Sequence, residues 1–294
     1  MNHNVTVVIR SSGERTEKAC YDIVRKQLSS NNIFIIKEKP FSLAVKRNFE
    51  IGIKEDRKFT LALDADILLR DNAVEDMIDR MENLSNDYFM YQGCVYDKFY
   101  GDFRAGGPHL YRTSLLREAI KYIPVDGSNL RPESATYIEM KKKGFHYYCD
   151  NIYYGLHDFG QFKIDIYRKF FLHAKKHKVL VHNFLDKWKK NIIDDEDYII
   201  ALRGLSDGLL YNGKVYINVD FFNEKSRFLF DILNVKEKVK KFTLNEVDEK
   251  IFDINIKLQN NLIKKGIIDS KQKRTKKNLK FRLKKLLKKV LKIN

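Results

Sequence analysis

The chain has few cysteines and no long apolar run. Of its 294 residues only three are cysteine, and Cys20, Cys94 and Cys149 lie far apart in the sequence. Zinc sites need closely paired cysteines and disulfide scaffolds need many, so we expect three reduced thiols with packing roles. No stretch approaches the roughly 18 apolar residues of a membrane-spanning helix, and Met1 leads almost directly into a strand-like run rather than a signal peptide. The sequence therefore favours a cytoplasmic location.

Acidic residues are missing from one end of the chain. Residues 271–294 contain ten Lys and two Arg but no Asp or Glu, so this tail carries +12 of the formal net charge of +17. The body of the protein carries only the remaining +5. Because the basic charge is local, we expect its binding partner to be local as well.

The same tail has apolar residues at helical spacing. They fall on one helix face, with lysines on the other: Leu279, Leu283, Leu286, Leu287, Val290 and Leu291. A basic amphipathic helix of this kind can lie on an anionic membrane surface. Packing on the body, packing on a second subunit and nucleic-acid binding are the alternatives. A phosphate backbone would leave the apolar stripe without a contact, so we expect no nucleic-acid partner. We favour the inner membrane surface as the partner of the tail. The protein could also form a homo-oligomer through this helix.

The rest of the sequence predicts an α/β domain. With 44% hydrophobic and 32% charged residues, the chain has a globular composition and is long enough to bury a large core. Short apolar runs alternate with helix-compatible segments, which indicates a β-α-β-α-β arrangement. The predicted elements are strands at Val5–Ile9, Ile33–Ile36 and Phe59–Leu63 and helices at Thr16–Leu28 and Phe41–Ile53.

Two carboxylates follow the third of these strands. Asp64 and Asp66 should emerge at the carboxyl edge of the sheet, where open α/β sheets bind ligands. Neighbouring carboxylates repel, and a hard cation such as Mg²⁺ or Mn²⁺ would relieve the repulsion and could hold a diphosphate. The alternative is that Asp64 caps the turn and Asp66 caps the next helix.

Basic and polar residues near this edge are candidates for binding a nucleotide. Arg10 and Ser11 belong to the polar turn after the first strand, and Arg47 lies on the helix Phe41–Ile53. A guanidinium has several donors in a plane, which suits phosphate oxygens. For Arg10, and for Arg15 in the same turn, a solvated loop charge is an equally weighted alternative.

The middle of the chain predicts further elements. They are a helix ending at Asn83, a strand at Tyr88–Tyr96, a glycine-dense loop at Gly101–Arg112, a helix from Arg131 to Gly144 and a strand at Phe145–Tyr154. The helix that starts near Pro132 has an acid, Glu133, in its first turn and bases in its last turn, which is typical of a well-formed helix. His157 and Asp158 follow the last strand.

Helices dominate from Ile164 onward. The predicted segments are helices at Ile164–His177, Val179–Trp188 and Glu196–Leu205, a hairpin at Gly208–Val219 and a helical stretch at Phe228–Lys265. The first helix carries a basic, aromatic cluster around Arg168, His173 and Lys176. It either faces an acidic acceptor or membrane or, as we prefer, is a solvated helix face. We divide the chain into residues 1–160, 161–270 and 271–294: an α/β domain, a mainly helical extension and the basic tail.

Three stretches, in this order, resemble a known family. They are Val-Thr-Val-Val-Ile-Arg, Ala-Val-Lys-Arg-Asn-Phe-Glu-Ile-Gly-Ile and Leu-Ala-Leu-Asp-Ala-Asp-Ile-Leu-Leu. Between Val5 and about Gly160 the chain is similar to the inverting GT-A glycosyltransferases of family 2, which build bacterial surface polysaccharides. The resemblance implies an α/β GT-A fold, with the Rossmann-like mixed sheet of nucleotide-diphospho-sugar transferases, followed here by a C-terminal helical extension.

The resemblance also implies roles at the donor site. Asp66 would bind the metal and Asp64 the metal or the ribose of the nucleotide-sugar. His157 is the candidate third metal ligand, with Asp158 as a partner that orients its imidazole. Arg10, Ser11 and Arg47 would seat the nucleotide.

Glu133 takes the position of the family's general base. An acceptor hydroxyl must lose its proton when it attacks the anomeric carbon, and a nearby carboxylate is the usual base. The match is incomplete because Pro132 replaces the acid that precedes the base in the family. A structural acid at the start of a helix is the alternative role.

The sequence thus predicts an inverting glycosyltransferase that depends on Mn²⁺ or Mg²⁺. It would move a sugar from a nucleotide-sugar to a glycan or lipid-linked acceptor, as a peripheral protein on the inner face of the cell membrane. The rival prediction is a non-catalytic GT-A-like module that docks on membrane or on partner enzymes. A nucleotidyltransferase is disfavoured because the sequence has no glycine-rich phosphate loop with a lysine near its amino terminus.

Overall fold

The computed structural model describes residues 4–126, 128–176 and 191–215, together with residues 185, 187–189, 221–222, 233–239, 242–243, 245 and 254. The chain forms two compact units, Met1–Glu246 and Val247–Asn294. The junction predicted near residue 160 therefore lies inside the first unit. The predicted tail helix Leu279–Leu291, and most of the predicted segments Val179–Trp188 and Phe228–Lys265, lie outside the described residues.

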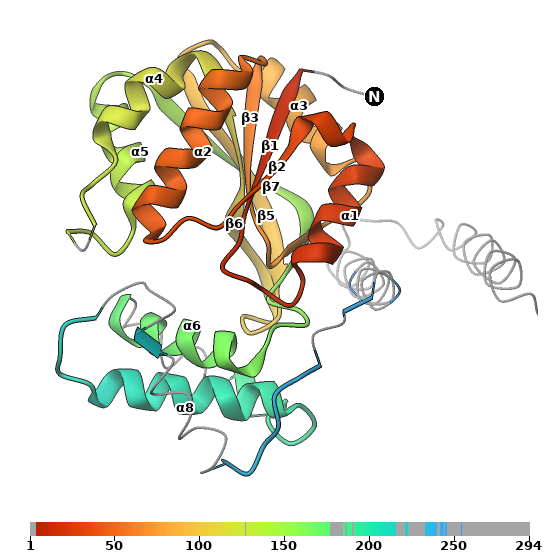
Figure 1. Ribbon diagram of the computed structural model, residues 1–294, viewed down its shortest axis with the longest axis vertical. Coiled ribbons are helices and arrows are strands. Elements are labelled where there is room, and N and C mark those ends of the chain that lie inside the picture. The colour runs from red at the N-terminus through yellow and green to blue at the C-terminus, as the bar shows by residue number, and fades with distance from the viewer. Residues whose placement is uncertain are drawn as a thin grey trace, which may run out of the picture. The chain divides into compact units, whose positions relative to one another are not determined.

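The first unit is built on a mixed sheet of seven strands in the order β2-β1-β3-β6-β5-β7-β4 (Figure 1). The strands are β1 (Val5–Arg10), β2 (Ile33–Ile36), β3 (Phe59–Asp64), β4 (Ile67–Leu69), β5 (Tyr88–Asp97), β6 (Asp102–Arg112) and β7 (His146–His157). β1 runs parallel to β2 and β3, β6 runs antiparallel to β3 and β5, and β7 runs parallel to β5 and antiparallel to β4. The predicted α/β class with a mixed sheet is confirmed.

The centre of the sheet is buried on both faces. All residues of β1 are buried, as are those of β3 up to Leu63. A continuous apolar run is typical of a strand that helices cover on both sides, which explains why these two strands could be predicted. Their register pairs Arg10 with Asp64, so the carboxyl ends of β1 and β3 lie side by side.

Helices cover both faces of this sheet. They are α1 (Glu17–Gln27), α2 (Phe41–Glu55), α3 (Ala73–Glu82), α4 (Leu116–Ala119) and α5 (Pro132–Lys142), whereas α6 (Lys163–Lys176) and α8 (Glu196–Leu210) lie beside the sheet. In Figure 1, α1 and α3 lie on one side of the sheet and α2, α4 and α5 on the other. None of the helices in the described part of the chain is long and apolar enough to cross a bilayer.

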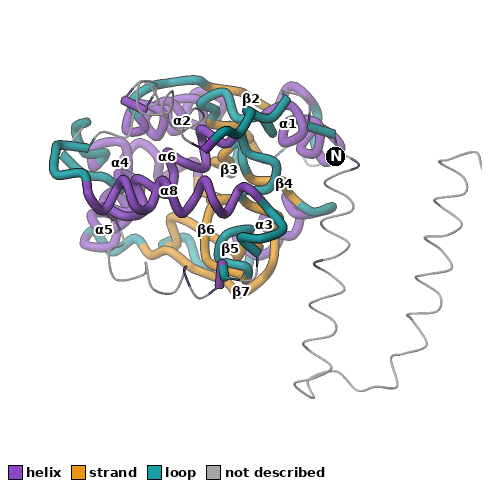
Figure 2. The backbone as a smooth tube through the Cα atoms, turned by 90° about the horizontal axis from the view of Figure 1, so that it is seen from below, coloured by secondary structure: helices purple, strands orange, loops and turns teal. Residues whose placement is uncertain are grey.

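α6 and α8 form a separate layer next to the edge of the sheet, and Figure 1 shows them running alongside each other, whereas they overlap in the view from below in Figure 2. Two glycines on α8 permit their close contact. A Cβ atom on Gly204 would lie 2.4 Å from the carbonyl oxygen of Tyr167, and one on Gly208 would lie 2.5 Å from that of Phe171. Any larger residue would therefore push the two helices apart.

An aromatic cluster fastens this helical layer to the turn after β5. Phe99, in that turn, packs against Trp188 and Tyr198. The indole Nε1 of Trp188 donates to the carbonyl of Phe99 at 2.8 Å, and the hydroxyl of Tyr198 donates to the carbonyl of Lys98 at 2.9 Å. Phe170 of α6 also packs on Phe99, with ring centroids 4.7 Å apart, so buried contacts as well as the connection to β7 tie α6 to the sheet.

Two predictions about elements are wrong. Gly101–Arg112 is not a loop, because residues from Asp102 onward form β6, which pairs with β3 on one side and β5 on the other. Those ladder hydrogen bonds are non-local and outweigh the turn preference of Gly and Pro. The predicted hairpin at Gly208–Val219 starts inside a helix, since α8 continues to Leu210 and Gly208 packs on α6.

Candidate functional site

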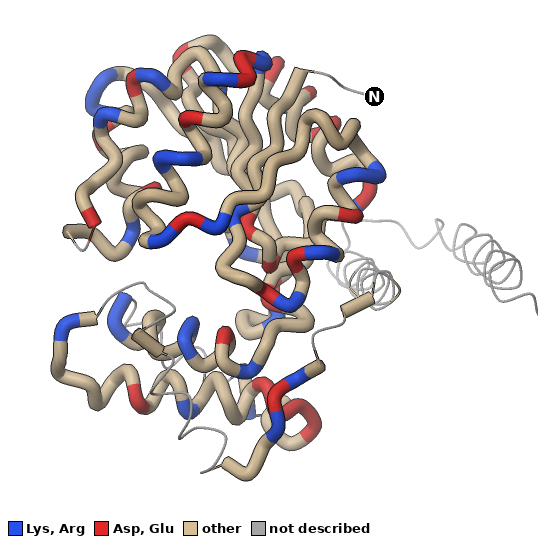
Figure 3. The backbone as a smooth tube through the Cα atoms, in the orientation of Figure 1, with Lys and Arg blue, Asp and Glu red and all other residues tan. Residues whose placement is uncertain are grey.

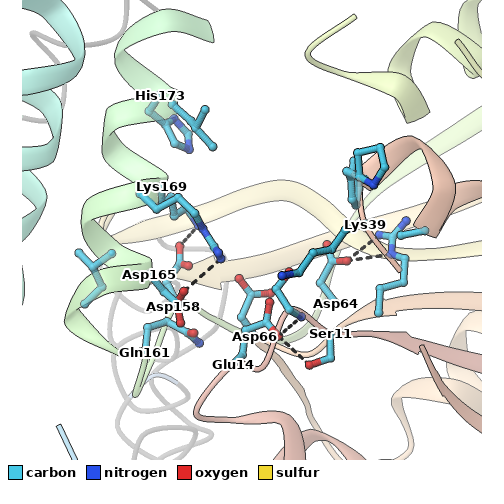
Figure 4. A pocket seen from close by; sticks show the side chains of 18 of the residues that line it. Ser11, Glu14, Lys39, Asp64, Asp66, Asp158, Gln161, Asp165, Lys169 and His173 are labelled. Carbon is cyan, nitrogen blue, oxygen red and sulfur yellow. Dashed lines mark hydrogen bonds and ion pairs between the residues drawn. The ribbon is translucent and has the colours of Figure 1, made fainter. Parts of the chain in front are cut away.

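A cavity of about 300 Å³ lies at the carboxyl edge of β1 and β3. Its walls are the loop after β1, the loop between β2 and α2, the end of β3, and the segment from Asp158 into α6. Figure 4 shows Ser11, Glu14, Asp64 and Asp66 on one side, across from Asp158, Gln161, Asp165 and Lys169. The cavity therefore lies where the sequence predicted a ligand site.

The backbone after β3 directs both predicted carboxylates to this cavity. The amide of Ala65 donates to the carbonyl of Arg10 at 3.0 Å, and the hydroxyl of Thr16 donates to the carbonyl of Ala65 at 2.7 Å. Ala65 is fully buried, whereas its two neighbours, Asp64 and Asp66, line the cavity. Ala65 and Asp66 form the turn between β3 and β4, and these two hydrogen bonds hold that turn so that Ala65 is buried while both acids line the cavity.

Asp66, His157 and Asp158 form a candidate metal centre. One ligand atom from each residue lies within 4.8 Å of the others, and His157 Nε2 is 3.5 Å from Asp66 Oδ2. Within the described residues, Asp66 Oδ1 is buried and has no hydrogen-bond partner. A buried carboxylate oxygen without a donor is costly, and a cation would satisfy it. Two carboxylates and an imidazole suit a divalent metal such as Mn²⁺ or Mg²⁺.

A second layer of contacts orients His157. Its Nδ1 lies 2.8 Å from Asp97 Oδ2, and Asp97 in turn accepts hydrogen bonds from the amides of Phe99 at 2.9 Å and Tyr100 at 3.0 Å. Arg104 Nε also donates to Asp97 Oδ2, at 2.7 Å. Nδ1 also lies 3.1 Å from Asp158 Oδ2, the carboxylate that the sequence predicted as a partner orienting the imidazole. Because Nδ1 faces these two carboxylates, Nε2 is left to face Asp66. This is the usual arrangement of a histidine that binds a metal.

The charges in this group compensate one another. Burial disfavours a charged imidazole, but the carboxylates of Asp158 and Asp66 raise the pKa of His157 to about 10. Burial also acts to raise the pKa of Asp66, but His157 and Lys169 hold it below the ordinary value. The two carboxylates therefore favour a positive charge between them.

Further acids crowd the same cavity. Burial, together with the charge of Asp66, raises the pKa of Glu14 to about 7. Burial raises the pKa of Asp165 to about 6, with Glu237 and Asp66 adding to the shift and Arg168 opposing it. The local excess of carboxylates makes the cavity a favourable place for a cation.

Arg10 joins two of the predicted site residues. Its guanidinium is only 4% exposed and donates to Asp64 Oδ1 at 2.8 Å and to Glu133 Oε1 at 2.5 Å. The ring of Phe41 lies 5.1 Å from the guanidinium carbon. Asp64 is thus bonded to Arg10 and is not one of the three grouped metal-ligand candidates.

Glu133 lies on the far side of Arg10 and does not line the cavity. The hydroxyl of Tyr111 also donates to its Oε1, at 3.3 Å. Burial acts to raise the pKa of Glu133, but Arg10 and His109 hold it well below the ordinary range. A carboxylate held in this way is a weak base, so the geometry favours a role for Glu133 in positioning Arg10.

The two remaining predicted residues have different environments. Ser11 lines the cavity, and its hydroxyl bonds the carboxylates of Glu14 at 2.9 Å and Glu17 at 2.5 Å. Arg47 is not one of the cavity residues. Its guanidinium is 51% exposed and lies 3.3 Å from Glu50 on the same helix. The structure therefore brings Arg10, Ser11, Asp64 and Asp66 together and leaves Arg47 on the outer surface of α2.

The cavity has a basic wall, which was the less favoured of the two interpretations of the basic cluster on α6. Lys169, His173 and Lys176 all line it from α6, and the ammonium of Lys169 bonds Asp158 Oδ2. Figure 3 shows basic residues recurring along this helix. The spacing of four and then three residues does place them on one helix face. That signal was visible, but it fits a solvated face equally well, which was the preferred interpretation.

No family model matches the chain, and no curated protein matches its sequence. Similar solved structures include a glycosyltransferase involved in the glycosylation of the major capsid of PBCV-1, with 13% identity and a TM-score of 0.37, covering 50% of this chain and 82% of that one. Residues 1–349 of S. aureus TarS have 13% identity and a TM-score of 0.35, covering 70% and 81% of the two chains. CMP:2-keto-3-deoxy-manno-octonic acid synthetase, solved with CTP, has 10% identity and a TM-score of 0.35, covering 52% and 91%. At these identities the likeness concerns the fold alone. Each of these TM-scores is below 0.5, so the likeness carries no argument about what this chain does.

Proposed function

We propose that this protein transfers a sugar from a nucleoside diphosphate-sugar to an acceptor hydroxyl, and that transfer requires a divalent cation. The observation that carries the proposal is the environment of Asp66. Its Oδ1 is buried without a hydrogen-bond partner among the described residues, and His157 and Asp158 lie beside it at the cavity. Such a group is expected where a cation and a diphosphate meet.

Asp66, His157 and Asp158 would hold the cation. Bound there, Mn²⁺ or Mg²⁺ would neutralise the diphosphate of the departing nucleotide. Lys169, on the opposite wall, bonds Asp158 and would supply a second positive charge to the phosphate oxygens. α6 covers this side of the cavity and would keep the diphosphate away from bulk water.

Asp64 is suited to bind the nucleotide. Arg10 bonds its Oδ1 only, and the side chain remains 38% exposed, so Oδ2 can accept a hydrogen bond from a ribose hydroxyl. Arg10 fixes the direction of the carboxylate, and Glu133 fixes Arg10. This chain of contacts gives Glu133 a defined role without requiring that it remove a proton.

The finer parts of the proposal rest on the sequence. The resemblance to family 2 enzymes implies inversion at the anomeric carbon, and a glycan or lipid-linked acceptor in the synthesis of a bacterial surface polysaccharide. The stripe Leu279–Leu291 would hold the enzyme at the inner membrane face, close to a lipid-linked acceptor. Nuclear magnetic resonance of the product would report the anomeric configuration.

The test is a turnover assay over a panel of UDP-, GDP- and CDP-sugars with Mn²⁺ or with a chelator. We expect metal-dependent release of one nucleoside diphosphate, lost in Asp66→Asn and kept in Asp79→Asn, which changes an exposed carboxylate on α3. Release of pyrophosphate from a nucleoside triphosphate would assign nucleotidyl transfer instead. Absence of both hydrolysis and transfer over the panel would favour the non-catalytic module.

A further inference from the structure

Residues 236–239, drawn in blue in Figure 1, form a segment that we call the strap. The strap belongs to the first unit, and each of its four residues makes a polar contact with another element. Apolar burial does not hold its end, because the side chain of Val239 is 75% exposed. The elements that these polar contacts reach therefore indicate what the strap does.

Two of the contacts hold the start of α6. The carboxylate of Glu237 accepts hydrogen bonds from the amides of Lys163 at 2.8 Å and Ile164 at 3.1 Å. Amides of the first turn have no partner inside a helix, and the helix dipole also favours a carboxylate beside them. The ammonium of Lys163, a buried side chain, donates to the carbonyl of Lys236 at 2.8 Å. The strap thus caps α6 from 74 residues further along the chain.

A third contact joins the strap to α8. The ammonium of Lys238 lies 2.6 Å from the buried carboxylate of Asp197, which also pairs with Lys98 in the turn after β5. This part of the strap is therefore fixed to the helical layer and, through Lys98, to the end of the sheet.

The fourth contact reaches the loop after β1. Arg15 Nε donates to the carbonyl of Val239 at 2.6 Å, and Arg15 Nη1 donates to the carbonyl of Gly160 at 3.1 Å. The ring of Phe242 lies 5.1 Å from the guanidinium carbon. Arg15 is not one of the cavity residues, and its guanidinium links the loop after β1 to the strap.

The strap thereby joins two walls of the cavity. Arg15 directly follows Glu14, which lines one wall. Lys163 lies between Gln161 and Asp165, which line the opposite wall (Figure 4). The distance between these walls therefore depends on contacts made outside the cavity.

The candidate metal ligands are held differently. β4 pairs with β7 so that Ile67, which follows Asp66, lies beside His157. The amide of Asp158 donates to the carbonyl of Asp66 at 3.4 Å. Because these contacts belong to the sheet and its turns, a looser strap would disturb the loop after β1 and the start of α6 before it disturbed the metal ligands.

We propose that the strap holds residues 11–15 and the start of α6 in the arrangement that binds the nucleotide, so that Arg15 and Glu237 are positioning residues of the donor site. The inference rests on the proposed function, which assigns the nucleotide to this cavity. A loop that is held in place before the ligand arrives loses less conformational entropy on binding. Releasing the loop lowers the fraction of molecules that are ready to bind, and the apparent affinity falls by the same factor.

The test is calorimetric titration of the full chain with Mn²⁺ alone and with UDP, GDP or CDP in saturating Mn²⁺. The variants are Arg15→Ala and Glu237→Ala, with Arg47→Ala and Glu75→Ala as matched controls that remove exposed charges outside the cavity. We expect each strap variant to bind the nucleotide about tenfold more weakly, as it would if the loop were ready to bind about a tenth of the time. The affinity for Mn²⁺ should stay that of wild type, which a general loss of structure would not allow.

The double variant distinguishes one strap from two independent contacts. If Arg15 and Glu237 act through the strap, the double variant should bind the nucleotide little more weakly than either single variant, whereas independent contacts would give a loss of about 100-fold. Such an additive loss, wild-type nucleotide affinity in either single variant, or a parallel loss of Mn²⁺ affinity would overturn the inference.

Hydrogen exchange of the unliganded protein makes the test independent of the donor. In the described part of the chain Glu237 accepts hydrogen bonds from the amides of Lys163, Ile164 and Lys238, and from no residue of the loop after β1. We expect Glu237→Ala, but not Glu75→Ala, to speed amide exchange at residues 11–15, an effect that has to pass through the strap. Unchanged exchange there would contradict the inference. If no nucleotide binds to wild type but this exchange becomes faster, the proposed function fails and the strap stands.

Discussion

Replacing Arg10 with alanine should destabilise the first unit by about 3 kcal/mol. Arg10 is 4% exposed and bonds two carboxylates, Asp64 and Glu133, so the substitution leaves both without their cation. Removing one partner of a buried ion pair costs roughly 3–5 kcal/mol. Asp64 is 38% exposed and regains part of its hydration, so Glu133, at 13%, accounts for most of the loss. We therefore expect a value at the low end of that range.

The effect of Arg10→Ala should depend on pH. Burial acts to raise the pKa of Glu133, but Arg10 and His109 hold it below the ordinary value. A carboxyl whose folded pKa is lowered contributes stability that is present above its unfolded pKa, about 4.3, and is lost as the pH falls toward the folded pKa. Without Arg10, burial favours the protonated acid. The difference between wild type and variant should therefore be largest near neutral pH and shrink below about pH 4.5.

Urea unfolding followed by far-ultraviolet circular dichroism would measure both effects. Arg47→Ala is the matched control, because it removes an arginine whose ion pair with Glu50 is 51% and 40% exposed. Exposed pairs contribute little, so this control should lose no more than about 0.5 kcal/mol. Equal losses in the two variants, or a loss in Arg10→Ala that does not change with pH, would refute the reasoning.

Two further substitutions test the surroundings of the site. Gly204→Ala should cost about 2 kcal/mol because the added Cβ would lie 2.4 Å from the carbonyl oxygen of Tyr167. Fluorescence of Trp188, the only tryptophan, should then report unfolding at a lower urea concentration, whereas Leu210→Ala, which truncates a side chain 76% exposed, should behave as wild type. Asp97→Asn should weaken Mn²⁺ binding about 10- to 100-fold, because it removes the carboxylate that orients His157. Asp102→Asn, at an exposed position, is its control in the same calorimetric titration, and equal Mn²⁺ affinity in the two variants would contradict the role of Asp97.

The sequence was most informative where a local pattern decides the structure. The runs Val5–Ile9 and Phe59–Leu63 form central strands because every residue in them can be buried. Once those strands are parallel neighbours, Arg10 and Asp64 must lie at the same edge of the sheet. The position of the cavity, and of Asp66 in it, thus follows from composition and chain order.

The sequence was least informative where partners are distant along the chain. No sequence motif includes Asp97. It orients the imidazole of His157 only because the strand register pairs it with that residue, 60 residues later. Helical spacing placed Arg47 on one face of α2 but did not indicate whether that face points toward the cavity or away from it. The same ambiguity made the face of α6 with Lys169 and Lys176 look like a solvated surface.

The proposed function requires that Asp66 belongs to a site for a cation and a diphosphate. The most direct test is thermal stabilisation of the protein by UDP, GDP, CDP and CMP, each with Mn²⁺ or with chelator, in wild type and Asp66→Asn. Ligands that bind only the folded state raise the unfolding temperature. We predict an Mn²⁺-dependent rise for at least one nucleoside diphosphate that is absent in Asp66→Asn. No rise with any nucleotide, or the same rise in the variant, would contradict the account.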